Sequence, residues 1–238
     1  MNVGFRVYTE VSRARRELVE ALQDAAVANI ADAMHGTGVM DSRIAPLYPG
    51  MKRIAGTAIT VDVTPGDGMM LRKALDIAQD GDVLVINAHG CRERAVLGGN
   101  VCIAVKRKKL GGIIVDGVVR DVEEARNLDV AVMACGVNAR SGTTNSGWGE
   151  VNVPIACGGS VVNPGDIVIG DLEGVVVVNK LFAGDVLESL RRVEEKRGRP
   201  DELSQRFEKS VSQQSYGLTA VNEELVSRGA SIIDGAVA

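Results

Sequence analysis

The chain has 238 residues, of which 45% are hydrophobic and only 3% aromatic, and its formal net charge is −4 at pH 7. An acidic balance with few aromatic rings argues against a nucleic-acid partner, which needs clustered surplus cations and stacking platforms. The four cysteines show no C-x-x-C spacing, and this pattern indicates free thiols rather than a disulfide framework or a zinc site.

The first residues contain no apolar signal segment, and no stretch approaches 18 consecutive apolar residues. A membrane-spanning helix needs about 20 such residues. We therefore expect a soluble cytoplasmic protein with no membrane contact.

The first third of the chain alternates between helical and strand patterns. Apolar residues recur at helical spacing over residues 12–34, where Asp24 could cap a second helix. Residues 54–63 alternate as a strand does, and Asp67 then opens a predicted helix that stops at Gly81.

Residues 82–121 predict a βαβ unit, with a strand at 83–87, a helix at about 99–109 and a strand at 112–116. The two strands of such a unit run parallel, so the loops that leave them emerge at the same edge of the sheet. Open α/β sheets bind their ligands at this edge.

Later strands are expected near 130–134, 165–171 and 174–179. A last helix is predicted by an apolar stripe of four residues: Phe182, Val186, Leu190 and Val193. Beyond this helix the composition turns polar, so we expect one domain over residues 1–196 and a helical arm over residues 197–238 that packs on a partner chain.

The arm also contains scattered apolar residues that a monomer would expose: Leu218, Val221, Leu225, Ile232 and Ile233. Exposed apolar patches rimmed by charge usually mark association surfaces. This pattern predicts a homo-oligomer.

Two features meet at the predicted ligand edge. Gly98, Gly99 and Asn100 directly precede a helix, where free backbone N–H groups can bind an anion. Arg120 offers a planar fork for a carboxylate, and Asp121 offers a hard oxygen to a magnesium-like ion. The alternatives are a tight turn and an exposed ion pair that contributes at most about 1 kcal/mol.

The sequence does not decide the roles of other side chains in these loops. The chain has only two histidines, which excludes a multi-histidine metal site. His89, Arg92 and Arg94 either contact a substrate or are ordinary loop residues. No lysine interrupts an apolar strand, so Schiff-base chemistry has no obvious nucleophile.

The string DGVVRDVEEA, followed by VNVPIACGGSVVNPGDIVIGDLEGVVVV, resembles the RraA-like family over roughly residues 18–196. This family contains the metal-dependent 4-hydroxy-4-methyl-2-oxoglutarate / 4-carboxy-4-hydroxy-2-oxoadipate aldolases and the regulators of ribonuclease E activity. The resemblance implies an α/β fold of the swivelling β/β/α type, assembly as a homotrimer or homohexamer, and active sites at subunit interfaces.

The resemblance also implies roles for individual residues. Arg120 would be catalytic and bind the pyruvyl carboxylate or the 2-oxo oxygen, and Asp121 would hold Mg²⁺ or Mn²⁺. Main-chain N–H groups of four residues would bind the substrate carboxylate: Gly98, Gly99, Asn100 and Val101. Glu194 or Glu195 of a neighbouring subunit, with Glu195 preferred, would complete the surroundings of the metal.

One position departs from the aldolase pattern. Those enzymes carry an acidic residue twenty-one positions before the arginine, where this chain has Gly99. The departure predicts either a weaker metal site or a different substrate.

These observations predict a divalent-metal-dependent lyase that cleaves a 4-hydroxy-2-oxo dicarboxylic acid to pyruvate and a second 2-oxo acid. Oxaloacetate decarboxylation is the expected side activity. The alternative is a non-catalytic regulator that binds a protein partner. A methyltransferase is a third option, but no recognisable adenosylmethionine loop supports it.

Overall fold

The computed structural model describes residues 2–142, 147–197 and 218–231. The chain divides into two compact units, Met1–Val193 and Glu194–Ala238. Among the described residues, no helix is both long and apolar enough to cross a membrane.

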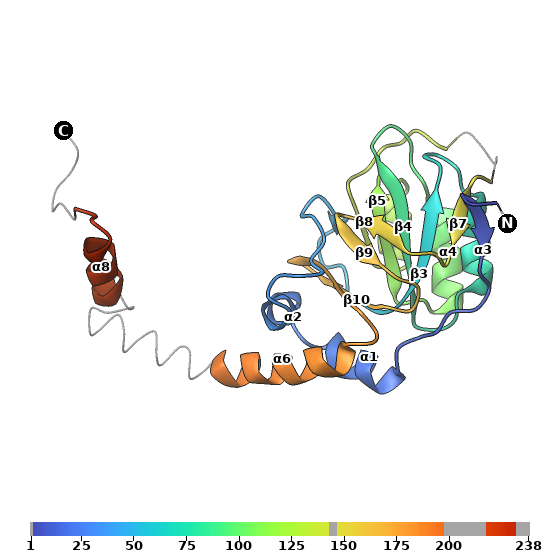
Figure 1. The fold of residues 1–238 in the computed structure, drawn as a ribbon. Coiled ribbons are helices and arrows are strands. Elements are labelled where there is room, and N and C mark those ends of the chain that lie inside the picture. The colour runs from blue at the N-terminus through green and yellow to red at the C-terminus, as the bar shows by residue number, and fades with distance from the viewer. Residues whose placement is uncertain (1, 143–146, 198–217, 232–238) are drawn as a thin grey trace, which may run out of the picture. The chain divides into compact units, whose positions relative to one another are not determined.

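The first unit contains the strands and most of the helices (Figure 1). The strands are β1 (Phe5–Val7), β2 (Ala45–Pro46), β3 (Ile54–Val63), β4 (Asp82–Cys91), β5 (Gly112–Gly117), β6 (Val132–Ala134), β7 (Gly149–Val151), β8 (Ile155–Cys157), β9 (Ser160–Val162), β10 (Ile167–Asp171) and β11 (Gly174–Val178). The helices are α1 (Arg16–Gln23), α2 (Val27–Ala33), α3 (Met69–Ile77), α4 (Gly99–Lys108), α5 (Val122–Asn127), α6 (Ala183–Arg197) and α8 (Leu218–Ser227).

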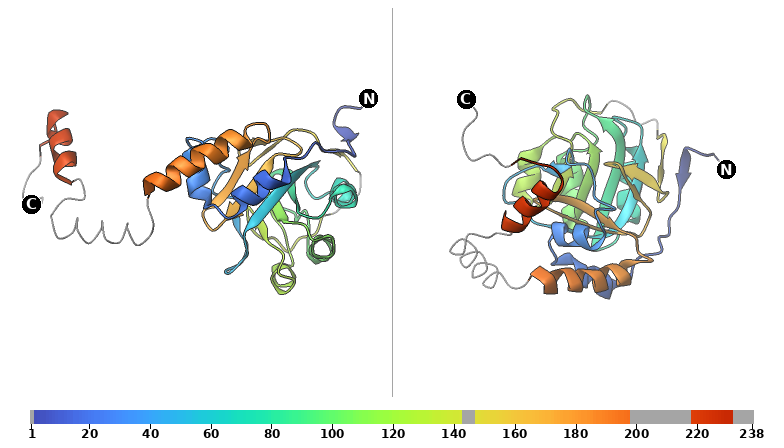
Figure 2. Two further views of the ribbon diagram at one scale, coloured as in Figure 1. Left: turned by 90° about the horizontal axis from the view of Figure 1, so that it is seen from below. Right: turned by 60° about the vertical axis from the view of Figure 1, so that its left-hand side comes forward.

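Strands β3, β4, β5 and β6 lie side by side and run parallel. The predicted βαβ unit is confirmed, because Val83 of β4 stands opposite Gly112 of β5 and Asn87 opposite Asp116. When parallel strands are added in one direction, right-handed crossovers place the connecting helices on one face. Figure 2 shows α3, α4 and α5 together on that side of the sheet.

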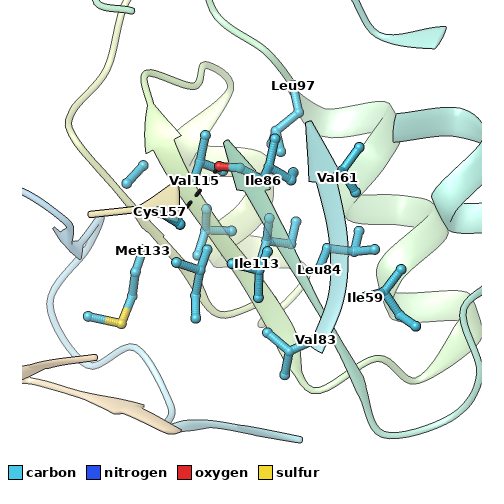
Figure 3. Close-up of a cluster of buried hydrophobic side chains, with 14 of the residues drawn as sticks. Ile59, Val61, Val83, Leu84, Ile86, Leu97, Ile113, Val115, Met133 and Cys157 are labelled. Carbon is cyan, nitrogen blue, oxygen red and sulfur yellow. Dashed lines mark hydrogen bonds between the residues drawn. The ribbon is translucent and has the colours of Figure 1, made fainter. Parts of the chain in front are cut away.

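The main core lies on this parallel sheet, where β-branched and other aliphatic side chains are fully buried. Figure 3 shows its centre, with side chains from all four parallel strands: Ile59, Val61, Val83, Leu84, Ile86, Ile113, Val115 and Met133. Cys157 of β8 joins the cluster, and its thiol donates to the Ile86 carbonyl with an Sγ–O distance of 3.8 Å. The hairpin β8–β9 contributes Cys157 to this core, and the mixed α/β architecture expected from the sequence is confirmed.

The antiparallel hairpin β10–β11 separates the main core from a second one. Because side chains alternate along a strand, Val168 and Val175 join the main core, while Ile167 and Val176 join the second. The second core is completed by helices α1, α2 and α6. This pattern explains why the strand sequences are apolar on both faces.

Asp24 does not cap the second helix, so that prediction is wrong. The N-cap of α2 is Ala26, without a side-chain hydrogen bond, and Asp24 instead ends α1. The Val27 N–H of α2 donates to Asp171 Oδ2 at 3.0 Å. A carboxylate distant in the sequence therefore satisfies this helix terminus, which a local pattern could not reveal.

The second unit begins within α6 and includes α8. Glu194 and Glu195 are both exposed near the end of α6. Leu225 of α8, one of the apolar residues expected to be exposed, is 44% exposed, and its neighbour Val226 is 56% exposed. Ile232 and Ile233, and the side chains of Leu218 and Val221, lie outside the part that the structure describes.

Candidate active site

A cleft of about 580 Å³ lies at the carboxyl-terminal edge of the parallel sheet. It is bordered by residues from the start of α3, the loop after β4, the start of α4 and the start of α5. Six residues singled out in the sequence line it together: Gly98, Gly99, Asn100, Val101, Arg120 and Asp121.

Two backbone hydrogen bonds hold the two loops of the βαβ unit together. The Val96 N–H donates to the Val118 carbonyl at 3.0 Å, and the Arg120 N–H donates to the Leu97 carbonyl at 3.1 Å. Backbone bonds of this kind satisfy main-chain groups that burial would otherwise leave unpaired. They place Arg120 directly beside the start of α4.

Asp121 has an unusual backbone conformation, with φ of +57° in the left-handed region. Few non-glycine residues adopt this conformation, although aspartate tolerates it better than most. The residue is the N-cap of α5, yet its carboxylate does not cap α5. Its Oδ2 instead accepts a hydrogen bond from the Gly99 N–H of α4 at 3.0 Å, which holds the carboxylate at the cleft.

The guanidinium of Arg120 has N–H donors that the described part of the chain does not use. Its Nε lies 3.5 Å from Asp121 Oδ2, and its side chain is 40% exposed. Within the described part of the chain it makes no other ion pair or side-chain hydrogen bond. Such an exposed pair contributes at most about 1 kcal/mol to stability, so the guanidinium is available to bind a carboxylate in the cleft.

The backbone donors at the start of α4 are partly used within the protein. The Gly99 N–H donates to Asp121, and the Val101 N–H donates to the Gly98 carbonyl at 3.0 Å. The N–H groups of Gly98 and Asn100 have no hydrogen-bond partner among the described residues. These two groups are therefore the ones open to an anion.

Gly98 and Gly99 leave space that two carboxylates fill. A Cβ added to Gly98 would overlap the Asp121 carboxylate, and a Cβ added to Gly99 would overlap the Glu124 carboxylate. Neither glycine has a positive φ, so neither is needed for its backbone conformation. At both positions the absence of a side chain leaves space for a neighbouring carboxylate.

Cys102 lies in the first turn of α4 and is buried. Burial raises the pKa of Cys102 to about 11, and the negative charges of Asp121 and Glu124 contribute to the same rise. The thiol is therefore protonated at neutral pH and is not a nucleophile there.

The residues of the cleft fit a magnesium-like ion. Asp121 and Glu124 present two carboxylates at its edge. Magnesium typically binds one or two carboxylates and completes its shell with water and substrate oxygens. No group of three or more His, Cys, Asp or Glu side chains suited to a metal occurs in the described ranges, so the protein would hold such an ion with few ligands of its own.

His89, Arg92 and Arg94 do not line the cleft. His89 Nε2 lies 3.2 Å from Asp62 Oδ1, Arg92 donates to the Cys135 carbonyl at 3.2 Å, and Arg94 donates to the Ser141 carbonyl at 3.3 Å. Each therefore has a local partner, and the partner of Arg94, Ser141, itself lines the cleft.

Sequence reasoning missed two charged residues of the cleft, Arg72 of α3 and Glu124 of α5. Arg72 lies one turn into the helix that directly follows β3. The rule that α/β sheets bind ligands at the carboxyl ends of their strands could therefore have identified it. Glu124 stands three residues after Asp121, the D-x-x-E spacing of a helix start. That spacing could have revealed α5.

The chain belongs to the RraA-like family, because the family model described as Aldolase/RraA matches residues 27–177. A protein of Halalkalibacterium halodurans named "Putative 4-hydroxy-4-methyl-2-oxoglutarate aldolase" is 33% identical over 182 residues, 76% of this chain and 86% of that protein. An uncharacterized protein of Methanocaldococcus jannaschii is 34% identical over 176 residues, 74% of this chain and 83% of that protein.

Solved structures agree with this assignment. An RraA protein of Streptomyces coelicolor, described as an unusual member of the RNase ES inhibitor family, matches with a TM-score of 0.70 and 28% identity. The match covers 82% of this chain and 99% of that one. The RNA-processing inhibitor RraA of Thermus thermophilis matches with a TM-score of 0.59 and 27% identity, over 65% of this chain and 93% of that one.

Proposed function

We propose that this protein is a divalent-metal-dependent lyase that cleaves a 4-hydroxy-2-oxo dicarboxylic acid to pyruvate and a second 2-oxo acid. The observation that carries the proposal is Arg120, whose open guanidinium stands beside two carboxylates in one cleft. The names of two relatives support it: the protein of Halalkalibacterium halodurans is named "Putative 4-hydroxy-4-methyl-2-oxoglutarate aldolase", and one of Arabidopsis thaliana is named "Putative 4-hydroxy-4-methyl-2-oxoglutarate aldolase 3".

The cleft offers a separate cation for each end of such a substrate. Arg120 and the N–H groups of Gly98 and Asn100 would bind the pyruvyl carboxylate and the 2-oxo oxygen. Arg72, on another wall of the cleft, would bind the distal carboxylate. A substrate with two carboxylates matches this arrangement of charge better than a monocarboxylate does.

The reaction is a retro-aldol cleavage. As the 4-hydroxyl group loses its proton, the C3–C4 bond breaks and its electron pair passes to C3 and the 2-oxo oxygen of the pyruvyl part. Arg120 stabilises the negative charge that develops there, and protonation at C3 yields pyruvate. A bound Mg²⁺ or Mn²⁺ would supply Lewis-acid stabilisation of the same oxygen.

Oxaloacetate decarboxylation would need the same residues. Loss of CO₂ from oxaloacetate leaves the same pyruvate enolate, so Arg120 would stabilise both reactions. No lysine is found among the described residues that line the cleft, which favours this route over Schiff-base chemistry.

Pyruvate release tests the proposal. Purified protein would be given 4-hydroxy-4-methyl-2-oxoglutarate or oxaloacetate, with and without EDTA, and pyruvate would be measured by a coupled dehydrogenase assay. We expect release that EDTA abolishes and that Mg²⁺ or Mn²⁺ restores. Absence of pyruvate from both substrates with either metal, or release that EDTA does not affect, would contradict the proposal.

A non-catalytic regulator is the second candidate, and it is favoured by the likeness to the RraA structures of Streptomyces and Thermus. The acidic chain would suit a basic protein partner. Inhibition of an RNase E-type nuclease by a protein that releases no pyruvate would favour this candidate.

We further propose that the protein acts as a homotrimer or homohexamer in which Glu195 of a neighbouring subunit reaches the metal. The support is the exposed apolar side chains of α8 together with the exposed carboxylate near the end of α6. Light scattering should report three or six chains. Glu195→Gln should weaken metal activation more than Glu188→Gln, a change earlier on the same helix, and an active monomer would contradict both statements.

A further inference from the structure

A groove between α3 and α4 continues the cleft beyond the residues that the proposed reaction uses. It has a volume of about 610 Å³, and the two helices that form it lie side by side on one face of the sheet (Figure 2). Three residues line both the groove and the cleft: Arg72, Leu75 and Asn100. A ligand held in the cleft can therefore extend directly into the groove.

One face of α4 forms a long wall of the groove. The residues of this wall recur at the spacing of a helix face: Asn100, Ile103, Ala104, Arg107 and Lys108. At a rise of about 1.5 Å per residue, Arg107 lies about 10 Å along the helix axis from Asn100. The groove therefore runs from the cleft to the last turn of α4.

The middle of the groove is apolar. Ile103 is 37% exposed there, and the half-buried side chains of Leu75 and Ala104 lie on the same walls. Asp76 also lines this stretch, but its carboxylate pairs with Lys73 Nζ at 2.7 Å. An apolar chain that covers these side chains removes apolar surface from water and is therefore favoured over a polar one.

Three consecutive cations in the last turn of α4 have different surroundings. Lys106 lines a separate pocket, and Lys108 Nζ donates to the Asp76 and Ala78 carbonyls at 3.0 and 2.9 Å. Arg107 lines the groove, is exposed, and has no ion pair or side-chain hydrogen bond within the part of the chain that the structure describes. The dipole of α4 favours all three cations, but Arg107 alone of the three places an unpaired guanidinium at the far end of the groove.

We propose that this groove binds the part of the substrate that leaves as the second 2-oxo acid, and that this part is an extended apolar chain whose terminal carboxylate binds Arg107. A planar guanidinium can bind a carboxylate through two parallel hydrogen bonds. The inference rests on the proposed lyase function and narrows its substrate class to acids with a longer chain than 4-hydroxy-4-methyl-2-oxoglutarate.

The geometry limits the length of this chain. Side chains of a helix incline toward its N-terminus, so the side chain of Arg107 reaches back toward the cleft. An extended chain advances about 1.2 Å per bond. About six to eight bonds would therefore join a 2-oxo group beside Arg72 and Asn100 to a carboxylate on Arg107.

Binding of 2-oxo acids of different length tests the proposal apart from catalysis. The full-length protein with Mg²⁺ would be titrated by calorimetry with 2-oxoglutarate, with 2-oxosuberate, whose chain has the required length, and with 2-oxooctanoate, which has the same chain without the terminal carboxylate. The variants are Arg107→Ala and Ile103→Ala. The matched control is Lys106→Ala, which removes the adjacent cation that does not line the groove.

We expect wild type to bind 2-oxosuberate roughly tenfold more tightly than either 2-oxoglutarate or 2-oxooctanoate, because only 2-oxosuberate brings a carboxylate to Arg107. Arg107→Ala should lose most of this gain, with its affinity for 2-oxoglutarate within about twofold of wild type. Ile103→Ala should weaken 2-oxosuberate and 2-oxooctanoate alike, by roughly threefold, because both chains cross the apolar stretch. Lys106→Ala should bind all three acids within about twofold of wild type.

The outcomes separate this inference from the proposed function. If wild type binds 2-oxosuberate no more tightly than 2-oxoglutarate, the groove is not a substrate subsite, whereas the lyase function is decided by pyruvate release. Equal affinities for 2-oxosuberate and 2-oxooctanoate, or equal losses in Arg107→Ala and Lys106→Ala, would overturn the role of Arg107. If binding depends on chain length and on Arg107 in a protein that releases no pyruvate, the groove stands as a site for such acids and the lyase function falls.

Discussion

Two arginine–aspartate pairs, Arg43–Asp116 and Arg120–Asp121, have aspartates only five residues apart, yet they serve different purposes. Asp116, at the end of β5, has a side chain that is only 6% exposed, and Arg43 Nη2 contacts its Oδ2 at 2.9 Å. It also accepts the Gly158 N–H at 2.8 Å. Five residues further on, the side chain of Asp121 is 39% exposed and stands 3.5 Å from Arg120.

The use of hydrogen-bonding groups distinguishes the structural pair from the binding site. Burial alone would raise the pKa of Asp116, but hydrogen bonds from Arg43 and the Gly158 N–H hold its pKa below the usual range. Asp116 is thus fully satisfied inside the protein. Arg120 and Asp121 keep donors and acceptors that the fold does not use, and this surplus is available to a ligand.

Changes to the exposed pair Arg120–Asp121 should have the strongest effect on activity. Arg120→Ala should lower kcat/KM for pyruvate release by about a hundredfold to a thousandfold, because stabilisation of the developing charge is lost. Arg120→Lys should also fail, since a point charge does not reproduce the planar fork. Steady-state kinetics measure both, and an Arg120→Ala enzyme within tenfold of wild type would overturn the assignment.

The same substitution should leave stability almost unchanged. An exposed pair contributes at most about 1 kcal/mol, so the urea midpoint of Arg120→Ala should stay close to that of wild type. A large loss of stability would mean that Arg120 supports the fold, and its kinetics would then say little about catalysis.

Breaking the pair Arg43–Asp116 should have the opposite effect, which is a loss of stability. Arg43→Ala leaves the Asp116 carboxylate buried without its cation, which should cost about 2 kcal/mol in the free energy of unfolding. Urea unfolding monitored by circular dichroism measures this loss. An Arg43→Ala protein as stable as wild type would show that the Gly158 N–H alone satisfies Asp116.

The two pairs also differ in their expected response to acid. Since the pKa of Asp116 is lowered in the folded protein, its contribution to stability is present above the ordinary carboxyl pKa of about 3.9 and is lost as pH falls through the folded value. The urea midpoint should therefore fall between pH 5 and pH 3, and less steeply in Asp116→Asn. Equal slopes in the two proteins would contradict this reading of the pair.

Much of the fold could be predicted because its parallel strands are long, aliphatic runs. The strand at 54–63 and the helix beginning at residue 99 match β3 and α4 at their starts. Strands β1, β7, β8 and β9 have three residues each, and α5 has six, too few to show a period. The residues of the predicted site that the βαβ rule brings together do meet, but Glu124 was missed because its helix was missed.

A more modest change is expected at Arg72. Arg72→Ala should raise KM for a dicarboxylate substrate by roughly tenfold with kcat within about twofold, because a cation remote from the reacting atoms contributes mainly to binding. Lys73→Ala is the matched control, since Lys73 is its neighbour on α3 and pairs with Asp76 at 2.7 Å instead of lining the cleft. An equal change in both variants, or a fall in kcat alone, would remove Arg72 from the substrate site.

A crystal structure of the wild-type protein soaked with Mg²⁺ and pyruvate would show directly whether Arg120, Asp121 and Glu124 form one metal and substrate site. We predict an ion beside the carboxylates of Asp121 and Glu124, with the carboxylate of pyruvate on the guanidinium of Arg120. An ion or pyruvate bound only elsewhere, with Arg120 and Asp121 in contact with solvent alone, would contradict this prediction.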